Sequence, residues 1–308
     1  MRSTAVSTGT AQAGTAVPIL MYHAVGHRPA EAAYGLSVSP ESFAEQLALL
    51  DGNGFTPVTT GELGGSWRSG RTVLPPKPVL ITFDDGYEGV HRHALPSLVK
   101  HGFRSSLFVS TGWLRGRYDE GGALDTMLDW DQVRELAAAG AEIGGHSHSH
   151  PQLDQLDDDR LRHEVLRCRE LVADELGSAP VSFAYPYGYS SRRVRAAVRD
   201  AGFGQALAVN NALATRGQGP YALRRVTVQR GTDIGRFERM VENRATFRDF
   251  ARERALTRGY AVVRRSRSAV RLARQSREAA RTRETDRARE ADRAREAAQS
   301  REGAASRV

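Results

Sequence analysis

Short apolar runs alternate along this chain with longer stretches of helical periodicity. The apolar runs, rich in β-branched and aromatic residues, lie at residues 17–22, 79–83, 105–109, 141–144, 181–185, 205–209 and 223–228. The stretches with helical patterning lie at residues 40–50, 89–101, 131–139, 157–176, 190–201 and 233–241. Several end at a glycine, as helix C-termini commonly do: Gly102, Gly140, Gly177 and Gly202. Repeated strand and helix units of this kind predict the α/β class, with parallel strands in a sheet or barrel.

Two connections within this region lack a clear strand or helix pattern. Residues 56–78 are rich in Gly and Pro, and we expect them to form the longest irregular connection. Residues 111–129 form the second and contain Trp113 and Tyr118. Because long loops in compact domains often carry function, we expect the second loop to overhang a site.

The last fifth of the chain differs in composition from the rest. Residues 251–308 hold 17 Arg against 8 acidic residues, a net of +9, whereas the whole chain carries +8. Residues 1–250 therefore carry a net charge of 8 − 9 = −1, so the region that contains the predicted catalytic domain, residues 17–250, is close to neutral. With few large apolar residues, the segment 251–308 cannot bury a core, so we predict a disordered tail or a solvated helix. We expect no specific nucleic-acid partner; contact of this basic tail with anionic surfaces is the alternative to a solvated role.

The N-terminal residues 1–16 are small and polar, and we predict a flexible segment there. They lack the apolar run of a secretory signal peptide, and no run of 18 apolar residues occurs in the sequence. The pattern predicts no transmembrane segment and, taken literally, a cytoplasmic location. The single cysteine, Cys168, excludes an internal disulfide framework.

Two adjacent carboxylates follow one predicted strand, in the segment TFDDG. Asp84 and Asp85 come directly after the apolar run 79–83, at the end of a strand where α/β folds collect their active sites. Burial of both carboxylates would be costly without a compensating cation. Taken alone, Asp-Asp-Gly is more simply interpreted as a turn with an Asp N-cap for the next helix.

A run of histidines follows another predicted strand, in the segment GGHSHSH. His146 and His150 are four residues apart, which lets both imidazoles face one ion from a helical turn while His148 points elsewhere. Two imidazoles and one carboxylate, with a position left for water, make up a catalytic zinc-type site, whereas structural zinc sites usually close with Cys. A solvated loop explains the histidines alone, but not their position at the same end of the sheet as Asp84 and Asp85.

Two further segments follow predicted strands at the same edge. In FAYPYG, Pro186 fixes the backbone, and Tyr187 with Gly188 can direct an N–H into a pocket as a donor to a developing oxyanion. In PILMYH, His23 ends the first strand. Taken alone, the first segment is an aromatic turn and the second a packed histidine, so both depend on the neighbouring motifs for a functional interpretation.

Together, TFDDG, HSHSH, YPYG and LMYH resemble the motifs of the polysaccharide deacetylases, the NodB-homology group also called carbohydrate esterase family 4. The resemblance covers approximately residues 17–228, in the family's order and spacing. It implies a distorted barrel of seven or eight βα units with parallel strands. It also implies removal of acetyl groups from N-acetylated or O-acetylated sugars with one divalent ion, zinc first and cobalt or nickel as alternatives. Relatives that act on cell-wall glycans meet them outside the cytoplasm, which disagrees with the location expected from the N-terminus.

The resemblance also implies roles for particular residues. Asp84 matches the catalytic base and Asp85 the carboxylate ligand of the metal, while His146 and His150 match its imidazole ligands. Tyr187 matches the residue whose backbone N–H binds the oxyanion.

The chain departs from the family pattern at two places. Many members have an Arg in the third motif that orients the base, where this chain has Ala184. They also have a Leu-x-His near the last strand, whose His is the general acid, where this chain reads Leu223, Arg224, Arg225. One branch of the family is circularly permuted and takes its acid from a MYH segment after the first strand. His23 fits that branch, so we assign it the acid role.

The predicted reaction is therefore hydrolysis of an acetamide in an acetylated glycan or amino sugar, a carbon–nitrogen bond outside peptides. Two alternatives stay open at this point. One keeps the metal and hydrolyses a cyclic amide or ureide. The other is a catalytically impaired glycan-binding protein, in which the two departures report lost catalysis.

Overall fold

A computed structural model describes residues 16–70, 72–245 and 250. Within them, eight strands form one sheet in the order β7-β6-β5-β4-β3-β1-β8, with β2 paired to β3. The named strands pair in parallel: Ile19–Tyr22 (β1), Thr56–Pro57 (β2), Pro78–Phe83 (β3), Ser106–Val109 (β4), Glu142–Gly145 (β5), Ser182–Ala184 (β6), Gln205–Leu207 (β7) and Val226–Thr227 (β8). The predictions for residues 1–15 and 251–308 lie outside the described residues.

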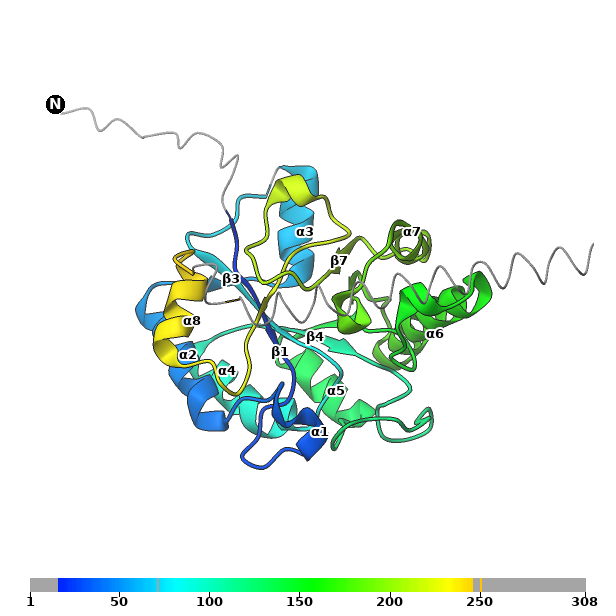
Figure 1. The fold of residues 1–308 in the computed structure, drawn as a ribbon, viewed down its shortest axis with the longest axis horizontal. Helices are drawn as coiled ribbons and strands as arrows, with labels where there is room; N and C mark the ends of the chain where they lie inside the picture. Colours follow the sequence, from blue (N-terminus) through cyan, green and yellow to red (C-terminus); the bar gives the residue numbers. More distant parts are fainter. Residues whose placement is uncertain (1–15, 71, 246–249, 251–308) are drawn as a thin grey trace, which may run out of the picture. The chain divides into compact units, whose positions relative to one another are not determined.

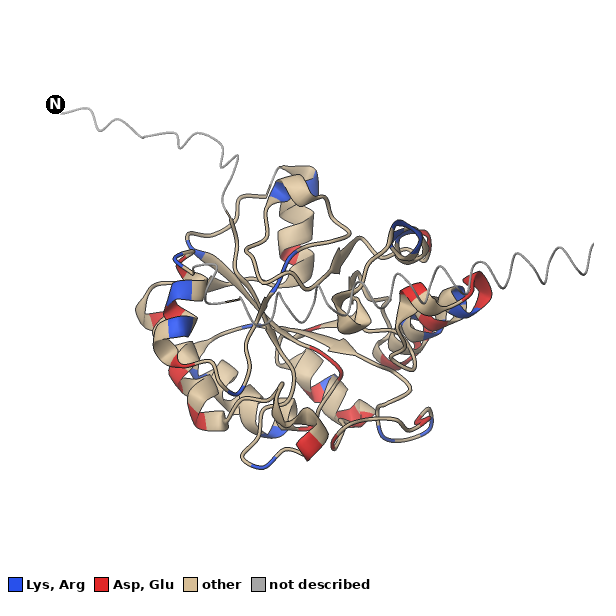
Figure 2. Cartoon of the chain, viewed as in Figure 1, with Lys and Arg blue, Asp and Glu red and all other residues tan. Residues whose placement is uncertain are grey.

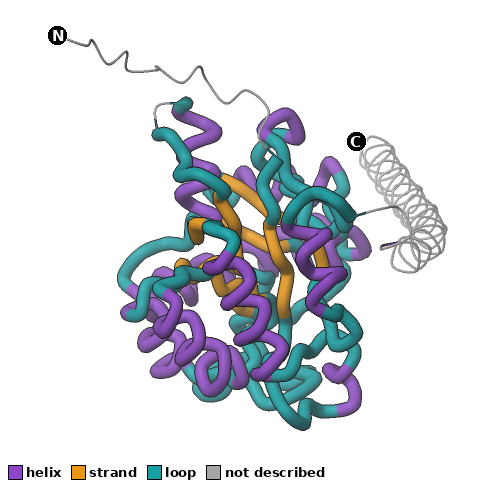
Figure 3. Tube along the Cα trace, turned by 90° about the vertical axis from the view of Figure 1, so that its left-hand side faces the viewer, coloured by secondary structure: helices purple, strands orange, loops and turns teal. Residues whose placement is uncertain are grey.

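The sheet is curled, and its two ends approach each other. An isolated parallel bridge joins Leu207, at the end of β7, to Leu223, shortly before β8. Figure 1 shows the strands at the centre with helices around them, and Figure 3 shows the same strands enclosed by helices and loops. The predicted parallel (β/α)7-8 barrel architecture is confirmed, as a curled half-barrel of parallel strands with helices.

The helices follow the predicted pattern closely. They are Glu31–Tyr34 (α1), Pro40–Gly52 (α2), Thr60–Ser69 (α3), Leu95–His101 (α4), Trp130–Ala138 (α5), Asp158–Leu176 (α6), Arg192–Asp200 (α7) and Ile234–Val241 (α8), with a π-helix at Val90–Ala94 (η1) and 3-10 turns at Leu153–Gln155, Pro186–Gly188 and Arg216–Gln218. Side chains cap six of them, as helix-starting Ser, Thr and Asp do. Figure 2 shows that most charged residues lie on the helices and loops around the sheet. None of the described helices combines the length and the apolarity that a bilayer crossing requires.

The prediction that residues 56–78 form an irregular connection is wrong, because this segment contains β2 and α3. Helix α3 begins at a capping box, in which Thr59 and Glu62 bond each other's backbone N–H. Its glycines concealed the helix in the sequence. A Cβ at Gly64 would overlap the buried side chain of Gln205, so glycine there allows α3 to pack closely on β7.

Alternation along the strands divides the core into two layers. Ile19, Leu80 and Phe108 belong to a cluster on one face of the sheet. Leu20 and Ile81, the next residue in each of two strands, belong to the cluster that packs under the helices on the other face. Thr82 and Asp84 lie two and four residues after Leu80, and His23 lies four residues after Ile19. Their side chains therefore point to the same face of the sheet as the first cluster. The strand pattern thus delivers polar side chains to one end of the sheet.

Candidate metal centre

The candidate site lies at the carboxyl ends of neighbouring strands. His23 follows β1, Asp84 and Asp85 follow β3, and His146 follows β5. β1 and β3 pair in register from Ile19 with Leu80 to Tyr22 with Phe83, so His23 and Asp84 leave the sheet side by side. Their side chains are buried.

Asp85, His146 and His150 converge on one point. The Oδ1 atom of Asp85 lies 3.2 Å from Nε2 of His146 and 3.3 Å from Nε2 of His150. One ligand atom of each residue lies within 4.8 Å of the others. Asp85 Oδ1 is buried and accepts no hydrogen bond from the described residues. A buried carboxylate oxygen that faces two imidazole nitrogens, without a donor, fits a divalent cation with N and O ligands.

The two histidines are held in different ways. Nδ1 of His146 lies 2.8 Å from the carbonyl oxygen of Ala184, so this nitrogen donates a proton and the Nε2 lone pair is directed at Asp85. The ring of His150 lies between Trp113 and Tyr187, at centroid distances of 4.4 Å and 4.8 Å. Burial alone would raise the pKa of Asp85, but the His146 and His150 imidazoles lower it well below its usual value.

The histidine segment is not the helical turn that its spacing predicts. Ser147 has a φ of 66° and His150 a φ of 57°, both in the left-handed region, so residues 146–150 form an irregular loop. His148 points away from the cluster, as expected, and contacts Thr111 and Glu120. Left-handed residues that are not glycine are strained, and such strain is common at functional sites.

Asp84 is held by a buried arginine. Nη1 of Arg225 lies 2.6 Å from Oδ1 of Asp84, and Nη2 lies 2.7 Å from Oδ2, a bidentate pair. Arg225 is fully buried, and Oδ2 of Asp84 lies 4.0 Å from Nε2 of His146. Burial would raise the pKa of Asp84, but Arg225, and after it His146, hold that pKa below its usual value. Asp84 is therefore an ionised, oriented carboxylate beside the candidate metal ligands.

Comparison with known proteins agrees with this geometry. A sequence profile for polysaccharide deacetylases matches residues 71–206, which include the segments TFDDG, HSHSH and YPYG. YxkH of Bacillus subtilis, assigned to the same family by its name, is 26% identical over 227 residues, covering 74% of this chain and 76% of that protein. Residues 71–206, which carry these segments, therefore match the polysaccharide deacetylase family.

Two further relatives extend the comparison. The poly-β-1,6-N-acetyl-D-glucosamine N-deacetylase of Escherichia coli K12 is 23% identical over 218 residues, which cover 59% of this chain and 32% of that enzyme. This chain therefore spans about a third of its length. Among solved structures, IcaB from Ammonifex degensii has a TM-score of 0.60 at 26% identity and covers 75% of this chain and 97% of that chain. The Streptococcus pyogenes deacetylase PplD, at 24% identity and a TM-score of 0.66, covers 75% and 99% and shares the fold.

The structure accounts for the first departure from the pattern of this family. An arginine is missing at Ala184, as the sequence indicated, but a guanidinium reaches the Asp84 carboxylate from Arg225 instead. Sequence reasoning missed this residue and counted it as a replaced general acid. The available signal was an arginine directly before the apolar start of a strand, where a buried charged side chain requires a partner.

His23 and Tyr187 lie around the same cluster. The imidazole of His23 is buried and its Nδ1 has no hydrogen-bond partner among the described residues. Burial lowers the pKa of His23, while the Asp85 and Asp84 carboxylates raise it less. Tyr187 has a φ of 59° inside the turn Pro186–Gly188, and its ring contacts His150. As the second residue of a single 3-10 turn, it has a backbone N–H without a partner inside that turn.

Two structural supports hold the histidine loop. The Glu164 carboxylate, from α6, accepts hydrogen bonds from the backbone N–H of His148 at 2.9 Å and of Ser149 at 2.8 Å. The loop 111–129 provides the second, because Thr111 and Glu120 bond the ring of His148 and Trp113 packs on His150. The expectation that this loop overhangs the site is met by Trp113. Tyr118 instead packs against the main core, with the guanidinium of Arg167 over its ring.

We expect Arg225→Lys to keep the metal content but to lower the rate of acetate release by about tenfold to a hundredfold, because a lysine cannot hold both carboxylate oxygens. Arg225→Ala should also lower the free energy of unfolding by about 3–5 kcal/mol, since it leaves Asp84 buried without a partner. The matched control is Arg224→Ala, at the exposed neighbouring residue. Steady-state rates and urea unfolding check both; an Arg225→Lys enzyme as fast as the parent would remove the positioning role.

Proposed function

We propose that this chain removes acetyl groups from N-acetylated sugars in a glycan, with one divalent ion, zinc by preference, bound by Asp85, His146 and His150. The convergence of these three ligand atoms beside the oriented Asp84 carboxylate is the observation that carries the proposal. The printed names of the relatives support the substrate class. One acts on poly-β-1,6-N-acetyl-D-glucosamine, and a Bacillus cereus relative, 27% identical over 150 residues, is a peptidoglycan-N-acetylglucosamine deacetylase.

The donor set accounts for the choice of metal. Two imidazoles and one carboxylate with an open position are typical of catalytic zinc, and a bound zinc ion would polarise the acetyl carbonyl and make water acidic at neutral pH. Groups outside this ligand set orient the two histidine rings. The Ala184 carbonyl fixes the His146 tautomer, and Trp113 and Tyr187 fix the plane of the His150 ring.

Asp84 is the proposed general base. Its lowered pKa keeps it ionised at neutral pH, so it can accept the proton of the attacking water. The Arg225 guanidinium holds the carboxylate plane, and Oδ2 faces His146 and therefore the ligand cluster. Arg225 acts through Asp84 and is a positioning residue.

Tyr187 and His23 have the remaining roles in this proposal. The Tyr187 N–H stabilises the negative charge that develops on the acetyl oxygen, as preorganised donors do. His23 donates a proton to the nitrogen of the departing amino sugar when the C–N bond breaks. The products are acetate and a free amine.

The glycan-binding alternative loses one of its two supports. It depended on the missing arginine and on the missing Leu-x-His histidine, and Arg225 supplies a bidentate partner for Asp84 in place of the first. We found no observation that favours a cyclic amide or ureide over an acetamide.

The test is acetate release by the full chain, stripped with a chelator and reloaded with zinc. We expect release from N-acetylglucosamine oligomers and from a chromogenic acetyl ester, lost on chelation and restored by zinc. A panel of cyclic amides and ureides should give no turnover. A zinc-loaded protein that releases no acetate from any of these substrates would contradict the proposed function.

A further inference from the structure

A polar cavity of about 280 Å³ lies close to the proposed reaction centre. Three segments build it: residues 24–29, which follow His23; residues 87–93, whose first members follow Asp84 and Asp85; and residues 125–126 of the loop 111–129. We call it the His27 cavity. The wall is thus a direct continuation of the two segments that carry the proposed base and acid.

Tyr87 connects the His27 cavity to the metal centre. Its ring lines the cavity and is 2% exposed. Tyr87 stands two residues after Asp85 and belongs to one buried cluster with Trp113, whose ring contacts that of His150 at a centroid distance of 4.4 Å. One buried side chain therefore belongs both to the cavity wall and to the cluster that packs on a proposed metal ligand.

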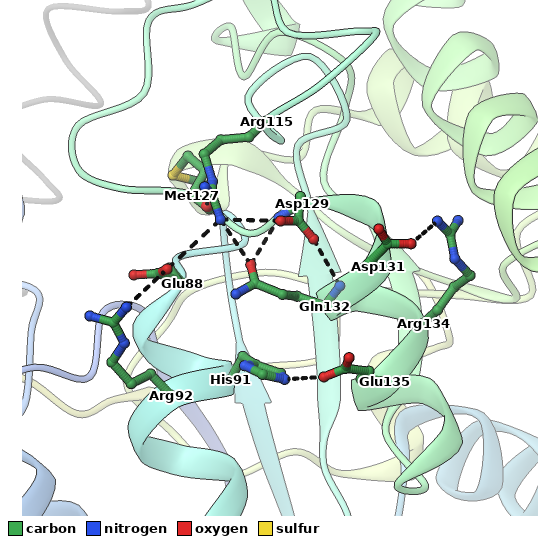
Figure 4. Close-up of polar contacts among 10 residues, drawn as sticks. All are labelled: Glu88, His91, Arg92, Arg115, Met127, Asp129, Asp131, Gln132, Arg134 and Glu135. Carbon is green, nitrogen blue, oxygen red and sulfur yellow. Dashed lines mark hydrogen bonds and ion pairs between the residues drawn. The ribbon is translucent and has the colours of Figure 1, made fainter.

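The acidic groups of the wall are fixed in place. Oε1 of Glu88 lies 3.4 Å from Nη2 of Arg92 and 3.8 Å from Nη2 of Arg115, as Figure 4 shows. The same Arg115 donates to the carbonyl of Met127, the residue after the cavity-lining Thr126. On the opposite side, the Asp125 carboxylate accepts the N–H of Ala30 and its own neighbour Thr126, each at 2.7 Å. These contacts preorganise the acceptors before a ligand enters.

The charge of the wall is balanced. Two arginines, Arg28 and Arg92, face two carboxylates, Glu88 and Asp125. The rings of His27 and His93 lie 5.4 Å apart. Burial, and then His27 and Arg92, lower the pKa of His93, so this imidazole is neutral at pH 7 and offers hydrogen bonds without charge. A wall with many donors and acceptors and little net charge suits a neutral ligand rich in hydroxyl groups.

We infer that the His27 cavity binds the sugar residue adjacent to the one that is deacetylated. Its volume is at or just below the lower end of ligand pockets, about 300–1,000 Å³, so it fits one sugar ring and not a longer chain. This inference rests on the proposed function, because only an oligomeric substrate has a neighbouring sugar. We therefore expect changes in the cavity to weaken the binding of an oligomeric substrate and to leave the chemical step unchanged.

Gly26 offers a way to fill the cavity without touching the reaction centre. It lines the cavity, and a Cβ added to it would meet no heavy atom within 4 Å. We expect Gly26→Phe to raise KM for an N-acetylglucosamine trimer about tenfold or more, with kcat on the chromogenic acetyl ester within about twofold of the parent. Gly26→Ala, the matched control, should leave both within about twofold. Arg28→Ala combined with His93→Ala should raise the same KM without filling the cavity.

Titration calorimetry with the trimer completes the test on the zinc-loaded full chain. Weaker trimer binding by Gly26→Phe and by the double variant, with ester hydrolysis unchanged, would support the inference. An unchanged trimer KM and affinity in both would overturn it, and so would an equal loss on the ester. These outcomes differ from failure of the proposed function, in which the parent protein itself releases no acetate.

Discussion

Asp84→Asn is expected to lower acetate release by at least about a hundredfold while the protein still binds its metal, since general bases contribute about 10²–10⁴ in rate. An amide at this position cannot accept the proton of water. It also offers Arg225 one oxygen in place of the two that the carboxylate presents at 2.6 and 2.7 Å. The measurements are kcat on N-acetylglucosamine oligomers and zinc content by elemental analysis.

The structure adds a stability effect to this prediction. Because Arg225 is fully buried, Asp84→Asn leaves its charge partly unpaired, so the unfolding midpoint should fall as well. Asp159→Asn is the matched control: it makes the same carboxylate-to-amide change at an exposed residue in the first turn of α6. We expect it to keep the parental rate within about threefold, in line with the small effect of most changes away from a site. An Asp84→Asn protein that is folded and fully active would remove Asp84 from the mechanism.

His146→Ala is expected to release the ion and abolish activity, and His150→Ala to do the same. Each change removes one of three protein ligands, and in the His146 variant the Asp85 oxygen loses its nearest nitrogen partner at 3.2 Å. Zinc content after dialysis, together with acetate release, measures both effects.

His148→Ala separates ligation from general damage to the histidine loop. His148 belongs to the same segment, but its ring contacts Thr111 and Glu120. We expect this variant to retain the full zinc complement. If His148→Ala loses zinc and His146→Ala retains it, the ligand assignment is wrong.

The sequence predicted the fold well because its signals are local. Apolar runs of strand length and helix-ending glycines recur in regular order, and the boundaries of α2 and α6 fall within about two residues of the prediction. The segment of α3 was lost because Gly64 allows close packing against Gln205 and does not mark a turn. This contact joins residues more than a hundred positions apart, so the sequence around Gly64 does not reveal it.

In the candidate site, too, the residues with local sequence signals were predictable and those that depend on distant contacts were not. Asp84, Asp85, His146 and His150 were predictable because they belong to segments that follow strands, and parallel strands bring their ends to one edge. Arg225 was not, because its partner Asp84 is 141 residues away and its long side chain crosses the buried interior to reach it. The left-handed backbone at Ser147 and His150 was also hidden, since residues other than glycine adopt it uncommonly and the sequence does not mark where.

The most direct measurement is a crystal structure of the zinc-loaded full chain with anomalous diffraction at the zinc edge. Our account predicts one zinc peak bonded to a carboxylate oxygen of Asp85 and to Nε2 of His146 and of His150, at about 2.0–2.2 Å. It also predicts an open coordination position on the side of Asp84. A peak bound elsewhere, or a well-ordered site at which these three atoms hold no ion, would contradict the metal centre and the hydrolase mechanism built on it.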